Sequence, residues 1–276
     1  MSDALLERRP EPPGFGRAVG TIAAMTVAGV LKKKRLIFLV ALLATPVFIA
    51  IMMKSEGVVE TEGFLPVFTQ AFFVVLAPLV CYFQGMSLFA EEVDNRTMGY
   101  LLMRPISRDA ILFGKFVGAT LTSFVFLLFS SFAFWSIWAY TGRVSDLASS
   151  PVLRDYLLTT PVLLLACALY TAFAITVALH LKHPMLFGSI YLMLIEIAFC
   201  NVPGPAAKLA LSHYLTRLAP DRWITPDELV GGELGMEIIR PDRVMLTVGL
   251  LVWLAVLLIV ATLRLRATDF SDSGEE

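Results

Sequence analysis

The chain has 276 residues, of which 57% are apolar and only 16% charged, with a net charge of −1 and a mean hydropathy of +0.76. Soluble domains are about 45–50% apolar and about 25% charged, so this composition excludes an ordinary soluble globular domain. The apolar residues fall in long runs, which is typical of membrane-spanning helices. Three cysteines (Cys81, Cys167 and Cys200) lie inside these runs and indicate neither a disulfide framework nor a metal site.

The N-terminal part of the chain does not fit a cleaved signal peptide. Residues 1–14 are polar and proline-rich, and we expect them to be disordered in the cytoplasm. Residues 15–35 contain an apolar stretch followed by a basic cluster, whereas a signal peptide has its positive charge first. The stretch is too short to cross about 30 Å of hydrocarbon. Apolar residues at helical spacing predict a helix over 16–31 that lies along the membrane surface, with a helix tucked against the protein as the alternative.

Six longer apolar segments follow, and we expect an all-α integral membrane protein in which each of them crosses the bilayer. We interpret these segments as helices because backbone N–H and C=O groups in lipid must form hydrogen bonds within the protein. The alternating pattern of a membrane-spanning strand does not appear in them. The predicted spans cover residues 36–53, 64–90, 116–140, 157–181, 184–202 and 244–263, within a transmembrane domain of residues 36–265. Prolines at positions 46, 66, 78 and 161 predict kinks or local unwinding.

The distribution of Lys and Arg predicts the orientation. With a cytoplasmic N-terminus, 14 of the 22 basic residues lie on the inner side, as the positive-inside rule requires. Six spans then place the C-terminal tail, residues 266–276, in the cytoplasm as well. An inner loop covers residues 91–115 and a long outer loop covers residues 203–243. The apolar part of the outer loop, residues 205–218, predicts short helices or a re-entrant element.

The inner loop is predicted to begin with a helix that stops at a proline. Its first residues include Glu91, Glu92 and Asp94, which suit a helix N-terminus because the helix dipole favours negative charge there. Pro105 ends the helix, since proline lacks the N–H that an interior helical position needs. The sequence therefore predicts a short helix followed by a sharp corner.

A second helix is predicted directly after this corner. Ser107 is a suitable N-cap, and Asp109 falls in the first turn. Arg96, Arg104 and Arg108 give the whole segment a basic polar side. Such a rigid charged segment can dock into a groove on a soluble partner, although a simple solvated turn between two spans is the alternative.

The inner loop resembles the characteristic motif of ABC type-2 (ABC-2) permeases. That motif runs approximately from a Glu through Gly-Thr and a Leu-rich helix to Pro-hydrophobic-Ser-Arg and Gly-Lys. The residues that match it are Glu92, Thr97, Leu101, Leu102, Pro105, Ser107, Arg108, Gly114 and Lys115. Arg96 departs from the common form, which has glycine. The layout of surface helix, six spans and long last outer loop extends the resemblance over nearly the whole chain.

The resemblance implies the permease subunit of an ABC-type exporter. In such permeases the loop holds a coupling helix that sits in a cleft of a separate ATPase subunit, and two permeases pair with two ATPases. ATP and Mg would bind to the ATPase, so no cofactor is expected in this chain. The implied location is the bacterial cytoplasmic membrane, in a homodimer or beside a similar permease. The implied ATPase-coupling residues are Glu91, Glu92, Asp94, Arg96, Thr97, Arg104, Pro105, Ser107, Arg108 and Lys115.

No catalytic motif is present in the sequence. Gly114-Lys115 lacks the upstream glycine of a phosphate-binding loop, and neither a zinc-protease nor a hydrolase signature appears. We therefore expect the chain to be no enzyme by itself. We also expect no nucleic-acid partner.

Three polar residues in the predicted spans are candidates for a role inside the membrane. Glu196 is a candidate because ionisable groups at this depth are rare. It either contacts substrate or makes a structural hydrogen bond to the outer loop, and similarity of the stretch 196–214 to some family members favours the second. Gln70 and Gln84 either line a pathway or bond between helices. The pattern Gly114-x3-Gly118 permits close helix approach.

Two rival functions remain open from the sequence. One is a non-transporting mechanical subunit of an ATPase-driven envelope machine for secretion, motility or maturation, with an envelope protein bound at residues 203–243. The other is a secondary transporter, which predicts more intramembrane charge and repeats between halves than the sequence shows. The sequence does not indicate a substrate.

Overall fold

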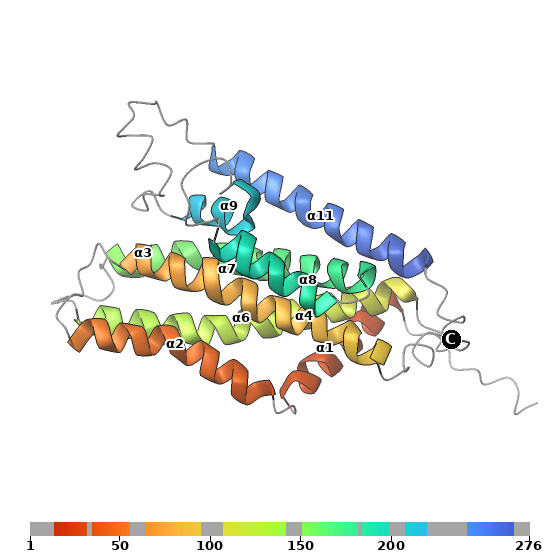
Figure 1. Ribbon diagram of the computed structural model, residues 1–276, viewed down its shortest axis with the longest axis horizontal. Helices are drawn as coiled ribbons and strands as arrows, with labels where there is room; N and C mark the ends of the chain where they lie inside the picture. Colours follow the sequence, from red (N-terminus) through yellow and green to blue (C-terminus); the bar gives the residue numbers. More distant parts are fainter. Residues whose placement is uncertain are drawn as a thin grey trace, which may run out of the picture.

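The computed structural model describes residues 14–31, 35–55, 64–94, 107–141, 151–181, 184–198, 208–219 and 242–267. All regular structure in these ranges is helical. Figure 1 shows an elongated bundle in which most of the long helices run along the long axis. The predicted disordered N-terminus, the middle of the inner loop, most of the outer loop and the C-terminal tail lie outside the described residues.

The helices follow one another in chain order with few interruptions. Two π-helical segments, η3 and η5, are continuous with neighbouring α-helices. The elements are α1 (Phe15–Leu31), α2 (Arg35–Ser55), α3 (Phe64–Thr69), η3 (Gln70–Leu76), α4 (Ala77–Asp94), α6 (Arg108–Thr141), α7 (Pro151–His180), α8 (Pro184–Ile190), η5 (Tyr191–Ala198), α9 (Leu211–Arg217) and α11 (Arg243–Ala267).

Four helices in the described residues are long and apolar enough to cross a membrane: the continuous helix from α3 through α4, then α6, α7 and α11. The other two predicted spans correspond to α2 and to α8–η5, which count as shorter apolar helices. The all-helical class is thus confirmed, and the number of six spans stays a prediction. The helix that contains the third predicted span, α6, begins at Arg108 directly after the predicted Ser107 cap and runs for 34 residues.

Pro78 explains why the second span changes its winding. Proline has no N–H, so one carbonyl in the preceding turn loses its usual helical partner. The π-helical segment η3 lies immediately before it, and the Ala77 N–H donates to the carbonyl oxygen of Phe72, five residues back. Such i to i+5 bonding is the definition of a π-helix. The predicted local unwinding near this proline therefore takes the form of one π-helical segment.

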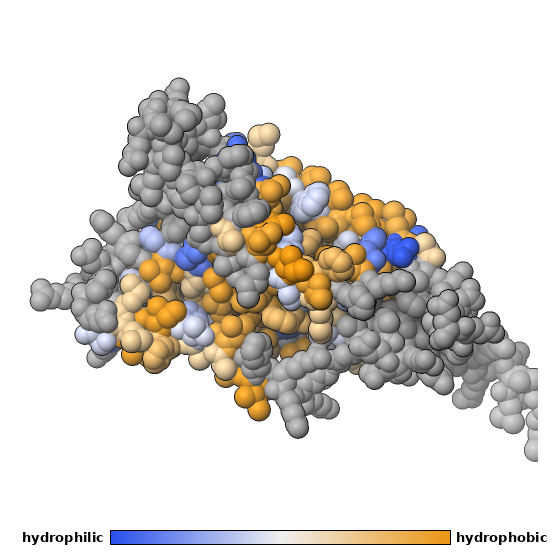
Figure 2. Space-filling model, viewed as in Figure 1, coloured by the Kyte–Doolittle hydropathy of each residue, from blue (hydrophilic) through white to orange (hydrophobic). Residues whose placement is uncertain are grey.

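Aromatic side chains fill the interior at the end of the bundle where α3 begins. Phe64 and Phe68 are fully buried, and their rings contact Phe134 of α6. The outside is apolar too, as Figure 2 shows for one face of the molecule. Only 17% of the apolar window of α11 is buried within the chain. An exposed surface of this kind is an aggregation liability in water and is expected in contact with lipid.

Candidate functional site

Ser107, two residues after the inner-loop proline, caps α6 as predicted. The Ala110 N–H donates to Ser107 Oγ at 3.3 Å, and Asp109 lies in the first turn of the helix. This cap satisfies one of the N–H groups that every helix leaves without an internal partner. The start of α6 is therefore fixed directly behind the inner loop.

Arg108 connects the start of α6 to the end of α11. Its Nη1 donates to the carbonyl oxygens of Leu265 at 3.2 Å and Arg266 at 3.1 Å. The last four carbonyls of a helix have no intrahelical partner, and positive charge is favourable there. The guanidinium therefore binds α11 at a place that needs a donor. Sequence spacing gave no signal for this contact, because the two ends are 157 residues apart.

A second contact between the same two helix ends is a bidentate ion pair. Arg266 Nε donates to Asp109 Oδ1 at 2.9 Å, and Arg266 Nη2 binds Asp109 Oδ2. The Arg266 side chain is 60% exposed, so solvent screens this pair and its contribution to stability is small. The pair aligns the two helix ends more than it strengthens the fold.

Lys115 connects α6 to α4, the helix on the other side of the inner loop. Its side chain is only 5% exposed, and its Nζ donates to the carbonyl oxygen of Leu88 at 3.0 Å. A buried ammonium group needs such acceptors to offset the loss of water. This bond joins α4 and α6, the two helices that flank the inner loop, at a level one to two helical turns away from the loop.

Two glycines let α1 lie directly on α6. A Cβ atom at Gly114 would meet Ile22 Cβ at 2.7 Å, and one at Gly118 would meet the Ala23 carbonyl oxygen at 2.8 Å. Only a residue without a side chain allows this distance. The predicted close approach at Gly114-x3-Gly118 is thus confirmed, and its partner is α1. We call the start of α6 from Ser107 to Gly118, together with its contacts on α1, α4 and α11, the junction.

The remaining inner-loop residues fall into two groups. Glu91, Glu92 and Asp94 lie in the last turns of α4, so the prediction that they begin a helix was wrong. The span helix continues through them because alanine and glutamate there favour helix and no breaker intervenes. The structure does not describe the side chains of these three residues. Arg96, Thr97, Arg104 and Pro105 lie outside the described residues.

Glu196 forms a separate polar site inside the bundle. Its side chain is fully buried. The carboxylate accepts four hydrogen bonds: from Tyr170 Oη at 3.0 Å, Tyr191 Oη at 2.9 Å, Leu211 N at 2.9 Å and Ser212 N at 3.0 Å. These donors belong to α7, η5 and α9, so one carboxylate joins three elements.

The π-helical winding of η5 brings Tyr191 and Glu196 together in this site. In an α-helix, residues five apart point about 140° away from each other, whereas i to i+5 bonding brings them onto one face. Tyr191 and Glu196 are five apart and hydrogen-bonded. The two backbone donors lie at the first turn of α9, where N–H groups lack helical partners. This geometry favours the structural interpretation of Glu196, because the contacts run to the predicted outer loop.

The two glutamines that were predicted as pathway candidates differ in environment. Gln70 lies in η3 and is half-buried. Gln84 lies in α4 and is 5% exposed, and neither its Oε1 nor its Nε2 has a hydrogen-bond partner among the described residues. Neither side chain lies in the junction or contacts Glu196 through a described hydrogen bond.

Long apolar helices with apolar outer surfaces define a multi-pass integral membrane protein. The family model described as "ABC-2 family transporter protein" matches residues 21–270, and the chain belongs to this family. The match includes both the junction and the Glu196 site, and it confirms the resemblance seen in the inner loop. The chain is therefore an ABC transporter membrane subunit, a class that works with an ABC ATPase. A comparison with curated proteins gives no match.

Proposed function

We propose that the chain is the permease subunit of an ABC-type exporter, driven by ATP hydrolysis on a separate ATPase. The observation that carries the proposal is the junction. The first turns of α6 follow the inner loop directly and contact α1, α4 and α11. A displacement of the inner loop therefore reaches four helices at once.

Motion would pass through the junction by short contacts between stiff helices. The part of the inner loop between α4 and α6 would dock in a cleft of the ATPase through Arg96 and Arg104. Arg108 would carry displacement of α6 to the end of α11, and Lys115 would carry it to α4. Since α6 has 34 residues, at 1.5 Å per residue its far end lies about 50 Å away. Movement at the ATPase side would thus change packing across the whole bilayer.

The proposed assembly has two permease chains and two ATPase chains, with ATP and Mg bound by the ATPases. Both termini would lie in the cytoplasm and α9 near the outer face of a bacterial cytoplasmic membrane. The positive-inside bias and the position of the junction beside the inner loop support this orientation. Glu196 would serve as a structural acceptor that fixes α9, not as a substrate contact.

The test separates docking from transmission. The tagged chain is purified from its native membrane in mild detergent, and proteins that co-purify are identified. We expect a stoichiometric soluble ATPase with the wild type, and a weak or absent ATPase with Arg104→Glu. Arg108→Gln should retain the ATPase but lower its substrate-stimulated activity, because Arg108 binds α11.

Arg154→Gln is the matched control, since this exposed arginine lies at the start of α7, far from the junction. It should behave as the wild type in both measurements. Recovery of the chain without any ATPase from cells that contain one would contradict the proposal.

A further inference from the structure

Gln84 of α4 and three hydroxyl side chains of α6 and α7 are buried without hydrogen-bond partners. The hydroxyl residues are Thr120, Ser123 and Thr171. All four side chains are at most 7% exposed, and none of their polar atoms has a hydrogen-bond partner among the described residues. Buried polar groups are almost always hydrogen-bonded, because leaving one unsatisfied is costly. Four such residues therefore need a physical explanation.

The four polar residues share a face of each helix with the apolar core. Residues three or four positions apart lie on the same face of a helix. On α4, α6 and α7, the polar positions have an apolar residue at this spacing on either side. These apolar neighbours are Cys81 and Leu88 on α4, Phe116 and Leu127 on α6, and Cys167 and Ile175 on α7. The polar side chains thus point in the same direction as the apolar ones.

The apolar neighbours belong to two separate hydrophobic clusters. One cluster contains Cys81, Leu127 and Cys167, and the other contains Ile175 with Leu88 and Phe116 packed against it. The helices α4, α6 and α7 contact one another pairwise. The four polar residues therefore lie between the two clusters, where the three helices meet. We call these four residues the polar layer.

A close contact between α4 and α7 supports this placement. A Cβ atom at Gly85 would meet the Thr171 carbonyl oxygen at 3.4 Å and Ala174 Cβ at 2.6 Å. Glycine is the residue that allows two helices to approach so closely. Gly85 directly follows Gln84 in the sequence, so Gln84 and Thr171 lie at the same height in the bundle.

The hydroxyl groups of the polar layer do not bond to their own helices. A helical Ser or Thr can donate to the carbonyl oxygen four residues earlier. Thr122 does so, with its hydroxyl 2.6 Å from the Gly118 carbonyl oxygen. Thr120, Ser123 and Thr171 make no such bond. Their hydroxyl groups are therefore available to a partner between the helices.

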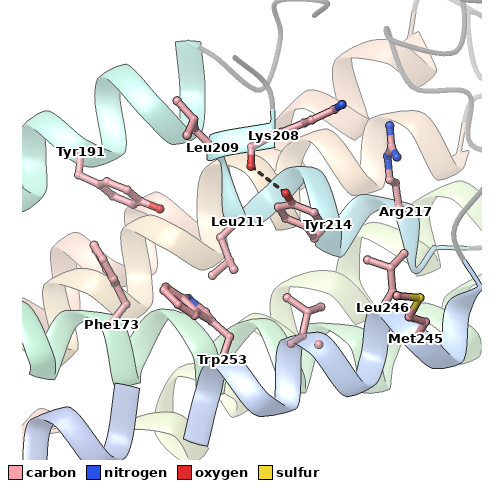
Figure 3. A pocket seen from close by; sticks show the side chains of 12 residues that line it. Phe173, Tyr191, Lys208, Leu209, Leu211, Tyr214, Arg217, Met245, Leu246 and Trp253 are labelled. Carbon is pink, nitrogen blue, oxygen red and sulfur yellow. Dashed lines mark hydrogen bonds between the residues drawn. The ribbon is translucent and has the colours of Figure 1, made fainter. Parts of the chain in front are cut away.

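The polar layer is separate from the cavity beside α11. That cavity has a volume of about 590 Å³ between α7, η5, α9 and α11, and Figure 3 shows Phe173 as its lining residue on α7. Thr171 lies two residues earlier, about 200° around the helix, so it faces away from the cavity. None of the four polar residues lines the cavity. The polar layer is therefore not hydrated through it.

We propose that ordered water binds in the polar layer and bridges the Gln84 amide to the three hydroxyl groups. The amide offers both N–H donors and an oxygen acceptor, and each hydroxyl donates and accepts. Water matches this mixed set. A metal cation would leave the amide N–H groups unmatched, and an anion would leave the amide oxygen unmatched. Buried waters typically make about three hydrogen bonds to polar groups that otherwise lack partners.

Bound water in this layer fixes the register of the three helices. A fully satisfied buried network stabilises one arrangement of the core, whereas a partly satisfied network is costly. Sliding α6 by one turn would carry Thr120 and Ser123 out of the layer and leave Gln84 and Thr171 without partners. This inference does not depend on the proposed transport role.

The first test is the thermal unfolding midpoint of the full chain in detergent with Thr171→Val, which replaces a hydroxyl by a methyl group. If water is bound, the midpoint should fall by about 2–4 °C, because the water loses a partner. A rise in the midpoint would overturn the inference, because replacing a hydroxyl that has no partner by an apolar group is stabilising.

Thr122→Val is the matched control, since this threonine is also buried but bonds within its own helix. Its midpoint should stay close to that of the wild type. An equal fall in both variants would show a general effect of losing a hydroxyl and would contradict a water site at Thr171.

A double variant tests whether one water network joins the layer. Gln84→Leu should lower the midpoint, and Thr171→Val added to it should cause little further loss, because the bridging water is already gone. Additive losses would contradict a shared network.

The direct observation is a crystal structure of the full chain at a resolution that shows ordered water. We expect water density within hydrogen-bonding distance of the Gln84 amide and at least one of the three hydroxyl groups. A direct bond from Gln84 to Thr120, Ser123 or Thr171, or an empty layer, would overturn the inference.

Discussion

The junction and the Glu196 site both join helices that are distant in sequence, but they do so in opposite ways. In the junction, Arg108, Asp109 and Arg266 bond at helix ends and keep access to water. At the Glu196 site, one fully buried carboxylate accepts four bonds. Contacts that keep access to water can break and re-form cheaply, whereas a buried carboxylate cannot lose partners without a large cost. We therefore predict that the helix-end contacts of the junction can move, whereas the region around Glu196 stays fixed; Lys115, the buried cation of the junction, does not belong to the water-accessible contacts.

The largest expected effect is at the fixed region. Glu196→Gln keeps the shape but turns one acceptor into a donor that faces hydrogen-bond donors. We expect a loss of stability on the order of 3 kcal/mol, because buried donors then lack an acceptor. The loss of stability is measured as a change in thermal unfolding, which size-exclusion chromatography monitors.

Tyr191→Phe sharpens this test, since it removes one of the four donors and leaves the carboxylate in place. We expect a smaller loss of about 1 kcal/mol. If Glu196→Gln left stability intact and instead changed the transported substrate, the substrate interpretation of Glu196 would replace the structural one.

The next largest effect is expected where α1 packs on α6. Gly118→Ala places a Cβ atom 2.8 Å from the Ala23 carbonyl oxygen. Overpacking of this kind costs about 1–3 kcal/mol and should move α1 away from α6. Trypsin cleavage at Arg17 should become faster. Gly20→Ala is the control, because open space surrounds its Cβ position, and it should be neutral or slightly stabilising. Equal cleavage rates in the two variants would argue against the contact between α1 and α6.

The smallest effect is expected at the exposed ion pair. Asp109→Asn should lower stability by less than about 1 kcal/mol, and added salt should reduce the difference from the wild type. Thermal midpoints at low and high salt measure both quantities. A loss as large as that of Glu196→Gln would show that this pair holds the fold together and would remove the distinction between the two regions.

The features that could be predicted are those that depend on residues close to one another in the sequence. The helical class, the Ser107 cap and the close approach at Gly114 and Gly118 all follow from local spacing or residue type. The local unwinding predicted near Pro78 is present, and its π-helical form is known only from the structure. The family follows from the ordered motif that ends at Lys115, and the family match confirms it.

Contacts between distant parts of the chain could not be predicted in this way. Arg108 binds carbonyls 157 and 158 positions away, and no periodicity in either segment encodes that pairing. The contact of Glu196 with the outer loop was predicted, but its bond to Tyr191 was not, since the π-helical winding of η5 changes which residues share a face. The acidic residues at the end of α4 were misplaced because charge preference at a helix N-terminus is weak beside helix propensity and continuity.

The most direct test of the central claim uses Lys115→Met in the purified permease–ATPase complex. Lys115 is a buried charged residue of the junction, and methionine has a similar unbranched side chain, one atom shorter, that cannot donate to the Leu88 carbonyl oxygen. We predict that the ATPase still co-purifies and that substrate-stimulated ATP hydrolysis falls about tenfold, as expected for the loss of one charged hydrogen bond. An unchanged rate in a folded complex would contradict transmission through the junction.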